Sequence, residues 1–177
     1  MKFFDWTTNV DGFASVGAST CDRLLSDAKM SPRRRSHLLL HESHADPTQR
    51  LLVAFDQGTY MQPHRYPEQG EMIIPMRGTL ALLLFSHDGH VADIIELTAG
   101  SIPISQITAG AWHTVVAMTS SALMLEIKPG PFRVAEFFWT ISFRKVSSCG
   151  ALGKVVVLRE RRRLLATLIA DAKRRSQ

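Results

Sequence analysis

Cysteine is scarce in this sequence, with only Cys21 and Cys149 among 177 residues. The two lie far apart and match no metal-binding or redox spacing. A disulfide framework like that of small secreted domains is therefore not expected, and free thiols in a reducing compartment fit the sequence better. We assign neither cysteine a chemical role.

Long apolar runs are also missing. No stretch reaches the roughly 18 uninterrupted apolar residues of a membrane-spanning helix. Residues 1–6 do not begin an apolar run of signal-peptide length. We therefore expect a soluble, cytoplasmic protein that has no membrane partner.

The net charge of +5 is unevenly distributed along the chain. Residues 131–177 carry eleven Lys and Arg against three acidic residues, a net charge of +8, whereas the remaining chain carries ten basic and thirteen acidic residues. The body of the protein thus has no positive balance to offer a phosphate backbone, and nucleic acid is not an expected partner.

The length suits one ordinary domain with appendages. We predict an N-terminal helix and lead-in strand segment in residues 1–46, a barrel in residues 47–132 and a basic C-terminal extension in residues 133–177. Helical patterning around Cys21, Leu24 and Ala28 ends at Ser31-Pro32, where a helix is expected to stop.

From Arg50 onward, short apolar or alternating runs are separated by turn residues. These runs are Arg50–Phe55, Glu71–Met76, Thr79–Phe85, Val91–Leu97, Ser101–Ile107, Thr114–Met118 and Ala122–Lys128. Asp88-Gly89 is a tight-hairpin signal, so the sheet should be mostly antiparallel. The pattern predicts an all-β fold, a single barrel or sandwich.

Three residues from separate strand ends carry metal-ligand chemistry. His64 and Tyr66 lie two apart in a predicted strand and so face the same side, Glu71 starts the next strand, and His113 follows the turn at Ala109-Gly110. Two imidazoles and a carboxylate can close on one divalent ion, whether Zn, Fe, Ni or Mn. We predict a single metal ion at His64, Glu71 and His113.

The spacing of Gly58, His64, Tyr66, Glu71 and Gly78 resembles the first motif of the cupins, with Tyr66 where a second His is usual. The resemblance implies a jelly-roll barrel, also called a double-stranded β-helix.

The second cupin motif is matched only in part, by Gly100 and by Gly110-Ala111-Trp112-His113. Thr108 replaces the usual Pro, Gly100 lies two residues further upstream than usual, and Ala117 stands where an Asn is usual.

Within the cupins, residues 31–132 resemble the WbuC family of bacterial cupin metalloproteins, often encoded among O-antigen and other surface-polysaccharide genes. The residues that carry this resemblance are Ser31-Pro32-Arg33-Arg34-Arg35, Leu40-His41, Asp46-Pro47, Gln49-Arg50-Leu51-Leu52, Pro63-His64-Arg65, Gly78, Gly110-Ala111-Trp112-His113-Thr114-Val115 and Lys128-Pro129-Gly130-Pro131. The resemblance gives His64, Glu71 and His113 the family's metal positions.

Tyr66 leaves three alternatives open, because a phenol with a pKa near 10 is a poorer ligand at neutral pH than an imidazole. Tyr66 is a phenolate ligand, or a hydrogen-bonding neighbour of a three-ligand ion, or the mark of a site that has lost its metal. We expect weakened but surviving metal binding.

Further residues are candidates for the ligand site. Glu126 and Lys128 share one face of a predicted strand, so either this pair or the apolar Leu125 and Ile127 enters the barrel. We assign Tyr66 and Glu126 as candidate catalytic groups. The candidates for substrate binding are His41, Arg50 and Lys128.

The function expected from these residues is binding of a small polar ligand, carbohydrate-like in chemistry, such as a sugar or sugar nucleotide in surface-polysaccharide synthesis. An enzyme would use the ion as a Lewis acid, with isomerisation or epimerisation the best match. The alternative is a non-catalytic binding module with a weakened or lost metal site.

The basic extension ends in a predicted helix over 158–175, with Leu158, Leu165 and Leu168 along one face. Simple solvation is the first expectation for this helix, and contact with a partner or with a dimer mate is the second.

Overall fold

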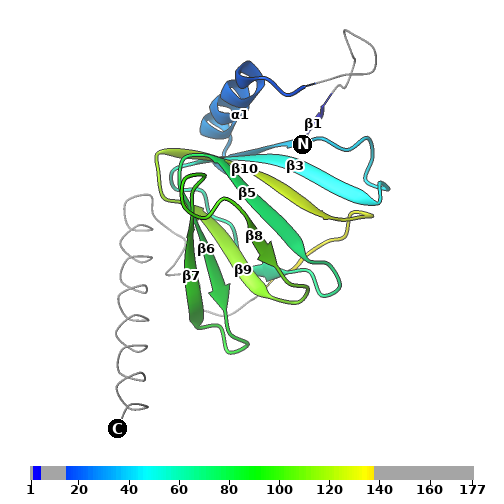
Figure 1. The fold of residues 1–177 in the computed structure, drawn as a ribbon, viewed down its shortest axis with the longest axis vertical. Coiled ribbons are helices and arrows are strands. Elements are labelled where there is room, and N and C mark those ends of the chain that lie inside the picture. The colour runs from blue at the N-terminus through cyan, green and yellow to red at the C-terminus, as the bar shows by residue number, and fades with distance from the viewer. Residues whose placement is uncertain (1, 5–14, 138–177) are drawn as a thin grey trace.

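The described residues, 2–4 and 15–137 of a computed structural model, form two β-sheets and one helix (Figure 1). The first sheet has the strand order β1-β2-β3-β10-β5-β8 and the second has the order β11-β4-β9-β6-β7. The strands of the first sheet are β1 (Lys2–Phe3), β2 (Arg35–Leu39), β3 (Thr48–Asp56), β10 (Ser121–Pro129), β5 (Glu71–Arg77) and β8 (Ser105–Ile107). Those of the second are β11 (Glu136–Phe137), β4 (His64–Arg65), β9 (Trp112–Ala117), β6 (Leu80–Phe85) and β7 (Val91–Leu97).

Neighbouring strands are antiparallel in every described pair except β1 with β2. The predicted all-β jelly-roll barrel with a short N-terminal helix is therefore confirmed. Strand β2 lies before the predicted barrel boundary at residue 47 and β11 lies after residue 132, yet both pair within the sheets. The domain boundaries stay predictions, and the basic helix predicted at 158–175 lies outside the described residues.

Helix α1 (Ala18–Met30) covers the outer face of the first sheet, as Figure 1 shows. Its residues Cys21, Leu24 and Ala28 are buried against Leu38 and Leu52 of the sheet. The helix ends at Met30 because Pro32 disfavours a helical conformation at the preceding residue, and Ser31 is indeed extended. The predicted leading helix is thus confirmed, and it packs on the outside of the barrel wall.

Strict alternation of side chains places an apolar core between the two sheets. In β6, Leu80 and Leu82 point into this core, whereas Ala81 and Leu83 face the opposite side. The core also takes in Phe55 from β3, which is fully buried. Burial of such side chains stabilises the fold by roughly 1.5–3 kcal/mol each.

Strand β10 alternates in the same way and settles which of its faces enters the barrel. Leu123 and Leu125 pack on the helix side. Met124 therefore points into the core between the sheets, and Glu126 and Lys128 share its face. Two charged side chains thus enter the interior of the barrel.

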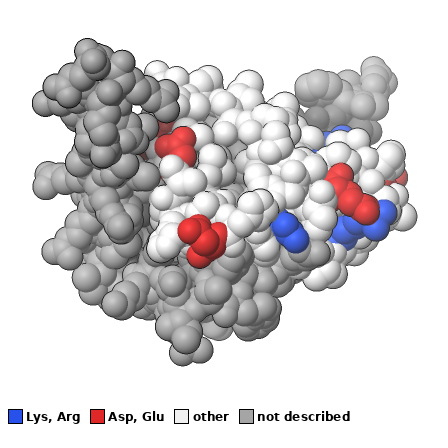
Figure 2. Space-filling model, turned by 90° about the horizontal axis from the view of Figure 1, so that it is seen from below, with Lys and Arg blue, Asp and Glu red and all other residues white. Residues whose placement is uncertain are grey.

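The surface of the described residues offers no broad basic field on the face drawn in Figure 2. Charged side chains are sparse there and both signs are present. In the portion of the chain that the structure describes, no helix has the length and hydropathy needed to cross a membrane.

Gly78 occupies the turn between β5 and β6 with φ of +69°, a conformation that residues with a side chain rarely adopt. An added Cβ would also collide with the carbonyl oxygen of Ser121 and with Oγ1 of Thr119. This double constraint explains the glycine at the end of the first motif.

We predict that Gly78→Ala lowers the free energy of unfolding by about 2 kcal/mol or more, because it adds backbone strain to a steric clash. Urea denaturation followed by circular dichroism measures the change. Gly100→Ala is the control, since nothing lies within 4 Å of its Cβ position, and it should leave stability nearly unchanged. Equal effects of the two changes would contradict the prediction.

Candidate metal centre

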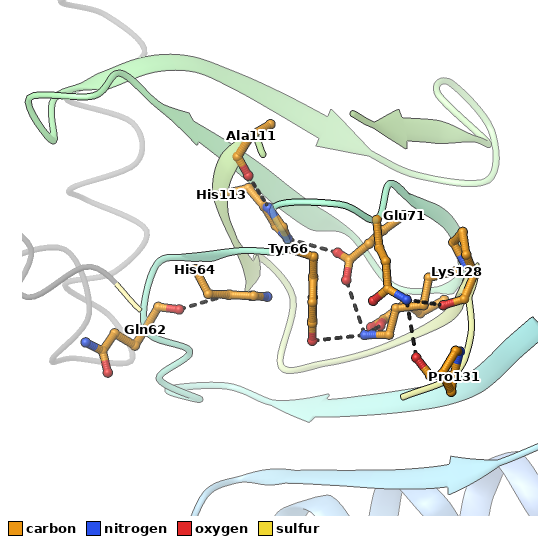
Figure 3. Close-up of polar contacts among 11 residues, drawn as sticks. Gln62, His64, Tyr66, Glu71, Ala111, His113, Lys128 and Pro131 are labelled. Carbon is orange, nitrogen blue, oxygen red and sulfur yellow. Dashed lines mark hydrogen bonds and ion pairs between the residues drawn. The ribbon is translucent and has the colours of Figure 1, made fainter. Parts of the chain in front are cut away.

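His64, Glu71 and His113 come together inside the barrel (Figure 3). His64 of β4 lies directly opposite His113 of β9, and their ring centroids are 4.4 Å apart. Glu71 is the first residue of β5. All three side chains are buried, and one ligand atom from each lies within 4.8 Å of the other two. Two sheets and three strand ends therefore meet at one point.

Main-chain carbonyl groups orient both imidazole rings. Nδ1 of His64 lies 3.0 Å from the carbonyl oxygen of Gln62, and Nδ1 of His113 lies 3.0 Å from that of Ala111 (Figure 3). A carbonyl oxygen can only accept, so each Nδ1 carries the proton and each neutral ring presents the lone pair of Nε2. Metal-binding histidines are typically held by this second hydrogen bond.

Nε2 of His113 lies 3.0 Å from a carboxylate oxygen of Glu71. A neutral ring in this tautomer would point its lone pair at the oxygen lone pairs, so a cation must lie between the two atoms. That cation is either a proton on His113, which makes an ion pair, or a metal ion bound by both groups. Burial, followed by the neighbouring His113, lowers the pKa of His64 to about 4, so this ring is neutral at pH 7.

The donor set fits one divalent metal ion. Ligand bonds of about 2.0–2.2 Å require donor atoms no more than about 4.4 Å apart, so side chains whose donor atoms lie within 4.8 Å of one another need only a small movement to bind one ion. His₂Glu is a known zinc donor set that leaves a fourth position open. The same set also suits iron, nickel or manganese. Among the described residues this is the one group of three or more His, Cys, Asp or Glu side chains that could hold an ion.

Tyr66 faces the same space as His64, as their spacing predicts, and the two rings meet edge to face with centroids 5.8 Å apart. Its hydroxyl accepts a hydrogen bond from the Lys128 ammonium group at 2.9 Å. Burial raises the pKa of Tyr66, which keeps the phenol protonated at neutral pH. A protonated phenol can share in hydrogen bonds beside an ion but is a poor ligand to it.

Lys128 holds the acidic residues of the interior together. Its ammonium nitrogen lies 3.2 Å from Glu71 and 2.8 Å from Glu126. Burial alone would lower the pKa of Lys128, but the carboxylates of Glu126 and Glu71 outweigh it and raise the pKa above the ordinary value. Burial raises the pKa of Glu126, whereas for Glu71 the contacts with His113 and Lys128 outweigh burial and lower the pKa.

A cavity of about 430 Å³ opens beside these residues, a size suited to a small organic molecule. All of the predicted site residues except Arg50 line it: His41, His64, Tyr66, Glu71, His113, Glu126 and Lys128. The structure thus brings these candidates to one space, and their roles as metal, catalytic and substrate-binding groups stay predictions.

Arg50 is the candidate that lies apart from the others. Its side chain is exposed and does not line the cavity, because its neighbours Gln49 and Leu51 point inward and consecutive strand residues alternate. Its main chain nevertheless contacts a cavity residue, since the Arg50 N–H group lies 3.1 Å from Nδ1 of His41. The geometry therefore does not support a direct contact between the Arg50 side chain and a ligand in this cavity.

His41 is 1% exposed and offers the cavity an unused donor. Its Nδ1 lies 3.1 Å from the nitrogen and 3.0 Å from the oxygen of Arg50. The oxygen already accepts the Leu40 N–H group, whereas the Arg50 N–H group can only donate, so Nδ1 accepts and Nε2 carries the proton. Within the described part of the chain this Nε2 has no hydrogen-bond partner.

Strand β2 contributes cavity residues that the sequence analysis did not assign to the site. Arg35, His37 and Leu39 line the cavity, whereas Leu38, between them, packs toward α1. This alternation with a period of two was the signal available in the sequence. It is easily missed because the residues on the inner face are polar, whereas strands are usually recognised by apolar residues.

Comparisons with known proteins do not assign a function to this chain. A family model described as a domain of unknown function (DUF6016) matches residues 16–97, less than half of the chain, which includes His64 and Glu71 but not His113. No curated protein matches.

Several solved structures are similar to this chain. Oxalate decarboxylase of Lactobacillus farciminis in a formate complex is 17% identical, with a TM-score of 0.45, over 52% of this chain and 27% of that chain. Oxalate decarboxylase of Bacillus subtilis, described with its Mn(II) centres, is 19% identical, with a TM-score of 0.45, over 52% and 24%. KdgF from Halomonas sp. is 16% identical, with a TM-score of 0.46, over 58% and 84%. This chain therefore spans about a quarter of the length of the oxalate decarboxylases.

The Lys128 network yields a prediction about stability. Lys128→Met should lower the free energy of unfolding by about 3–5 kcal/mol at pH 7, because it leaves two buried carboxylates without their cation. The loss should shrink at pH 5, where Glu126, whose pKa burial already raises, takes up a proton more readily. Chemical denaturation at the two pH values measures both effects.

Lys29→Met makes the same chemical change at an exposed residue of α1 and should have little effect. A Lys128→Met protein as stable as the Lys29→Met protein would show that the carboxylates do not depend on this ammonium group.

Proposed function

We propose that the protein is a metal-binding cupin that holds one divalent ion at His64, Glu71 and His113. The observation that carries the proposal is the orientation of the two rings. Both Nδ1 atoms donate to main-chain carbonyls, so Nε2 is the nitrogen left to bind an ion in each ring, and one ligand atom of each ring lies within 4.8 Å of the buried Glu71 carboxylate. A divalent ion among the three groups would satisfy the carboxylate and both imidazoles at once.

The ligand that we propose is a small polar molecule such as a sugar or sugar nucleotide. The cavity beside the metal-capable residues has a suitable volume and is lined by His41, Tyr66, Glu126 and Lys128 as polar groups. The resemblance to the WbuC family suggests a role in surface-polysaccharide synthesis. This role depends on the resemblance, since contacts alone do not name a pathway.

In an enzyme of this kind, the ion would supply Lewis acidity at a ligand hydroxyl or carbonyl oxygen. Glu126 would be the proton acceptor, because burial raises its pKa above the ordinary value of a carboxyl group. Tyr66 keeps its proton and can donate a hydrogen bond while its oxygen accepts from Lys128. Lys128 stays charged and stabilises negative charge on neighbouring oxygens.

A second candidate function is a non-catalytic binding module without a metal. The observation that favours it is the contact of the Lys128 ammonium group with Glu71 at 3.2 Å. This ammonium group, together with a protonated His113, satisfies the carboxylate with no ion present. Metal content separates the two candidates.

We predict that protein purified without a tag, stripped with a chelator and titrated with Zn²⁺ or Mn²⁺ binds one ion per chain. His113→Ala should abolish binding, because only two strong ligands remain. His90→Ala is the matched control, since His90 is exposed in the β6–β7 turn, and it should bind as the unchanged protein does. Calorimetry measures all three, and absence of binding in the unchanged protein would favour the metal-free module.

Tyr66→His should raise the metal affinity, because it places a second imidazole on the same side of the strand as His64. The gain should be largest near pH 7 and should shrink as pH rises, since an imidazole needs no deprotonation there and a phenol does. The measurement is the same titration at pH 7 and pH 9. Equal affinities in the two proteins at pH 7 would show that position 66 does not limit binding.

A further inference from the structure

Two arginines lie between this cavity and a second hollow beside α1, at a distance from the metal-capable residues. Arg33 and Arg35 line both spaces. Arg35 is half-buried, and its Nε is inaccessible to solvent and has no hydrogen-bond partner among the residues that the structure describes. Nη1 of Arg35 donates a hydrogen bond to the carbonyl oxygen of Tyr60, and the distance of 3.4 Å is long for such a bond. Arg35 therefore has donor capacity that the protein does not use.

The neighbouring charges are paired and these two are not. Arg34, which lies between them in the sequence, contacts Asp56 at 2.6 Å, and Lys128 contacts both Glu71 and Glu126. No ion pair joins Arg33 or Arg35 to a carboxylate within the described ranges. Glu126 attracts Arg35 from a distance, but Lys128 already contacts its carboxylate.

The two arginines also repel each other. Burial, followed by the charge of Arg33, lowers the pKa of Arg35, so the charged form of this guanidinium is destabilised where it lies. An arginine in protein remains charged despite such a shift. A bound anion would remove the repulsion and would supply acceptors for the terminal nitrogens of the two guanidinium groups.

The register of the first sheet locates the pair relative to the metal-capable end. Arg35 pairs with Phe55, whereas Gln49, six residues away on the same strand, pairs with Lys128. Six residues of a strand span about 20 Å of main chain, a separation that the long side chains of Arg35 and Lys128 reduce. The same cavity is lined by Arg35 and by His113, so it extends between these two places.

We propose that Arg33 and Arg35 form an anion subsite for the acidic group of an elongated organic ligand, a phosphate or a carboxylate, whose other end reaches the metal centre. The fork of an arginine matches the two oxygens of either group. The proposal rests on the proposed function only in treating this cavity as the ligand site, since anion binding by the arginines does not require the metal ion.

The test is titration calorimetry of chelator-stripped protein with inorganic phosphate and, separately, with acetate at constant ionic strength. Arg35→Gln should weaken binding about ten-fold or more, because it removes a charge-assisted hydrogen bond. Arg33→Gln should weaken it in the same direction. Arg50→Gln is the matched control, since Arg50 is exposed outside the cavity, and it should bind as the unchanged protein does.

Thermal unfolding without added anion shows whether the variants fold. Arg35→Gln should be at least as stable as the unchanged protein, because it removes an unpaired, partly buried charge beside a like charge. A purely structural role through Tyr60 would instead lower the melting temperature and leave anion affinity unchanged, which would overturn the proposal.

The two anions distinguish the sources of the ligand chemistry. Binding of phosphate alone assigns the subsite to a phosphoryl group, and binding of acetate alone assigns it to a carboxylate. Binding of neither, or equal weakening by Arg50→Gln, overturns the proposal.

Metal titration of Arg35→Gln distinguishes the anion subsite from the metal centre, because loss of anion binding with unchanged metal binding is expected. Failure of all variants to bind metal would count against the metal centre only.

Discussion

The Glu71 carboxylate is the group on which the interior of the barrel depends. It is 3% exposed, and burial of an unpaired carboxylate would be strongly unfavourable. One of its oxygens lies beside Nε2 of His113 and the other beside the Lys128 ammonium group. These contacts connect β5 with β9 of the opposite sheet and with β10 of its own sheet. The contacts that form the site therefore also help to hold the two sheets together.

Charge balance around Glu71 also determines what the site can bind. Glu71 and Glu126 provide two negative charges, and Lys128 provides one positive charge. The remaining negative charge is available to a proton on His113 or to a divalent ion shared with His64. Because carbonyl groups hold both rings by Nδ1, neither ring can turn away to relieve the competition without losing a hydrogen bond. The site is therefore prepared for a second cation besides Lys128.

Most of the fold could be predicted from the sequence, since the seven longer strand runs correspond to β3 and to β5 through β10. Strand β2 lies in the predicted lead-in strand segment, but its bounds were not located, because its inner face carries Arg35 and His37 instead of apolar residues. The proximity of His64, Glu71 and His113 could be predicted from their spacing, because each residue begins a strand or lies near its start. The position of Arg50 outside the cavity could not be predicted, because the sequence does not show which residues of β3 point into the barrel.

The same alternation explains why one cavity can have two chemically different ends. Strands β2 and β10 flank β3 in the first sheet, so their inner residues line the same space. Along β10 the inner face changes from Met124 to Glu126 and Lys128 toward the metal-capable end, whereas along β2 the charged residue lies at the opposite end, at Arg35. A ligand that matched this pattern would carry an acidic group at one end and metal-binding oxygens at the other, because each end offers a different partner. Specificity would then depend on ligand length as much as on either contact, since the separation is set by the rigid register of β2, β3 and β10.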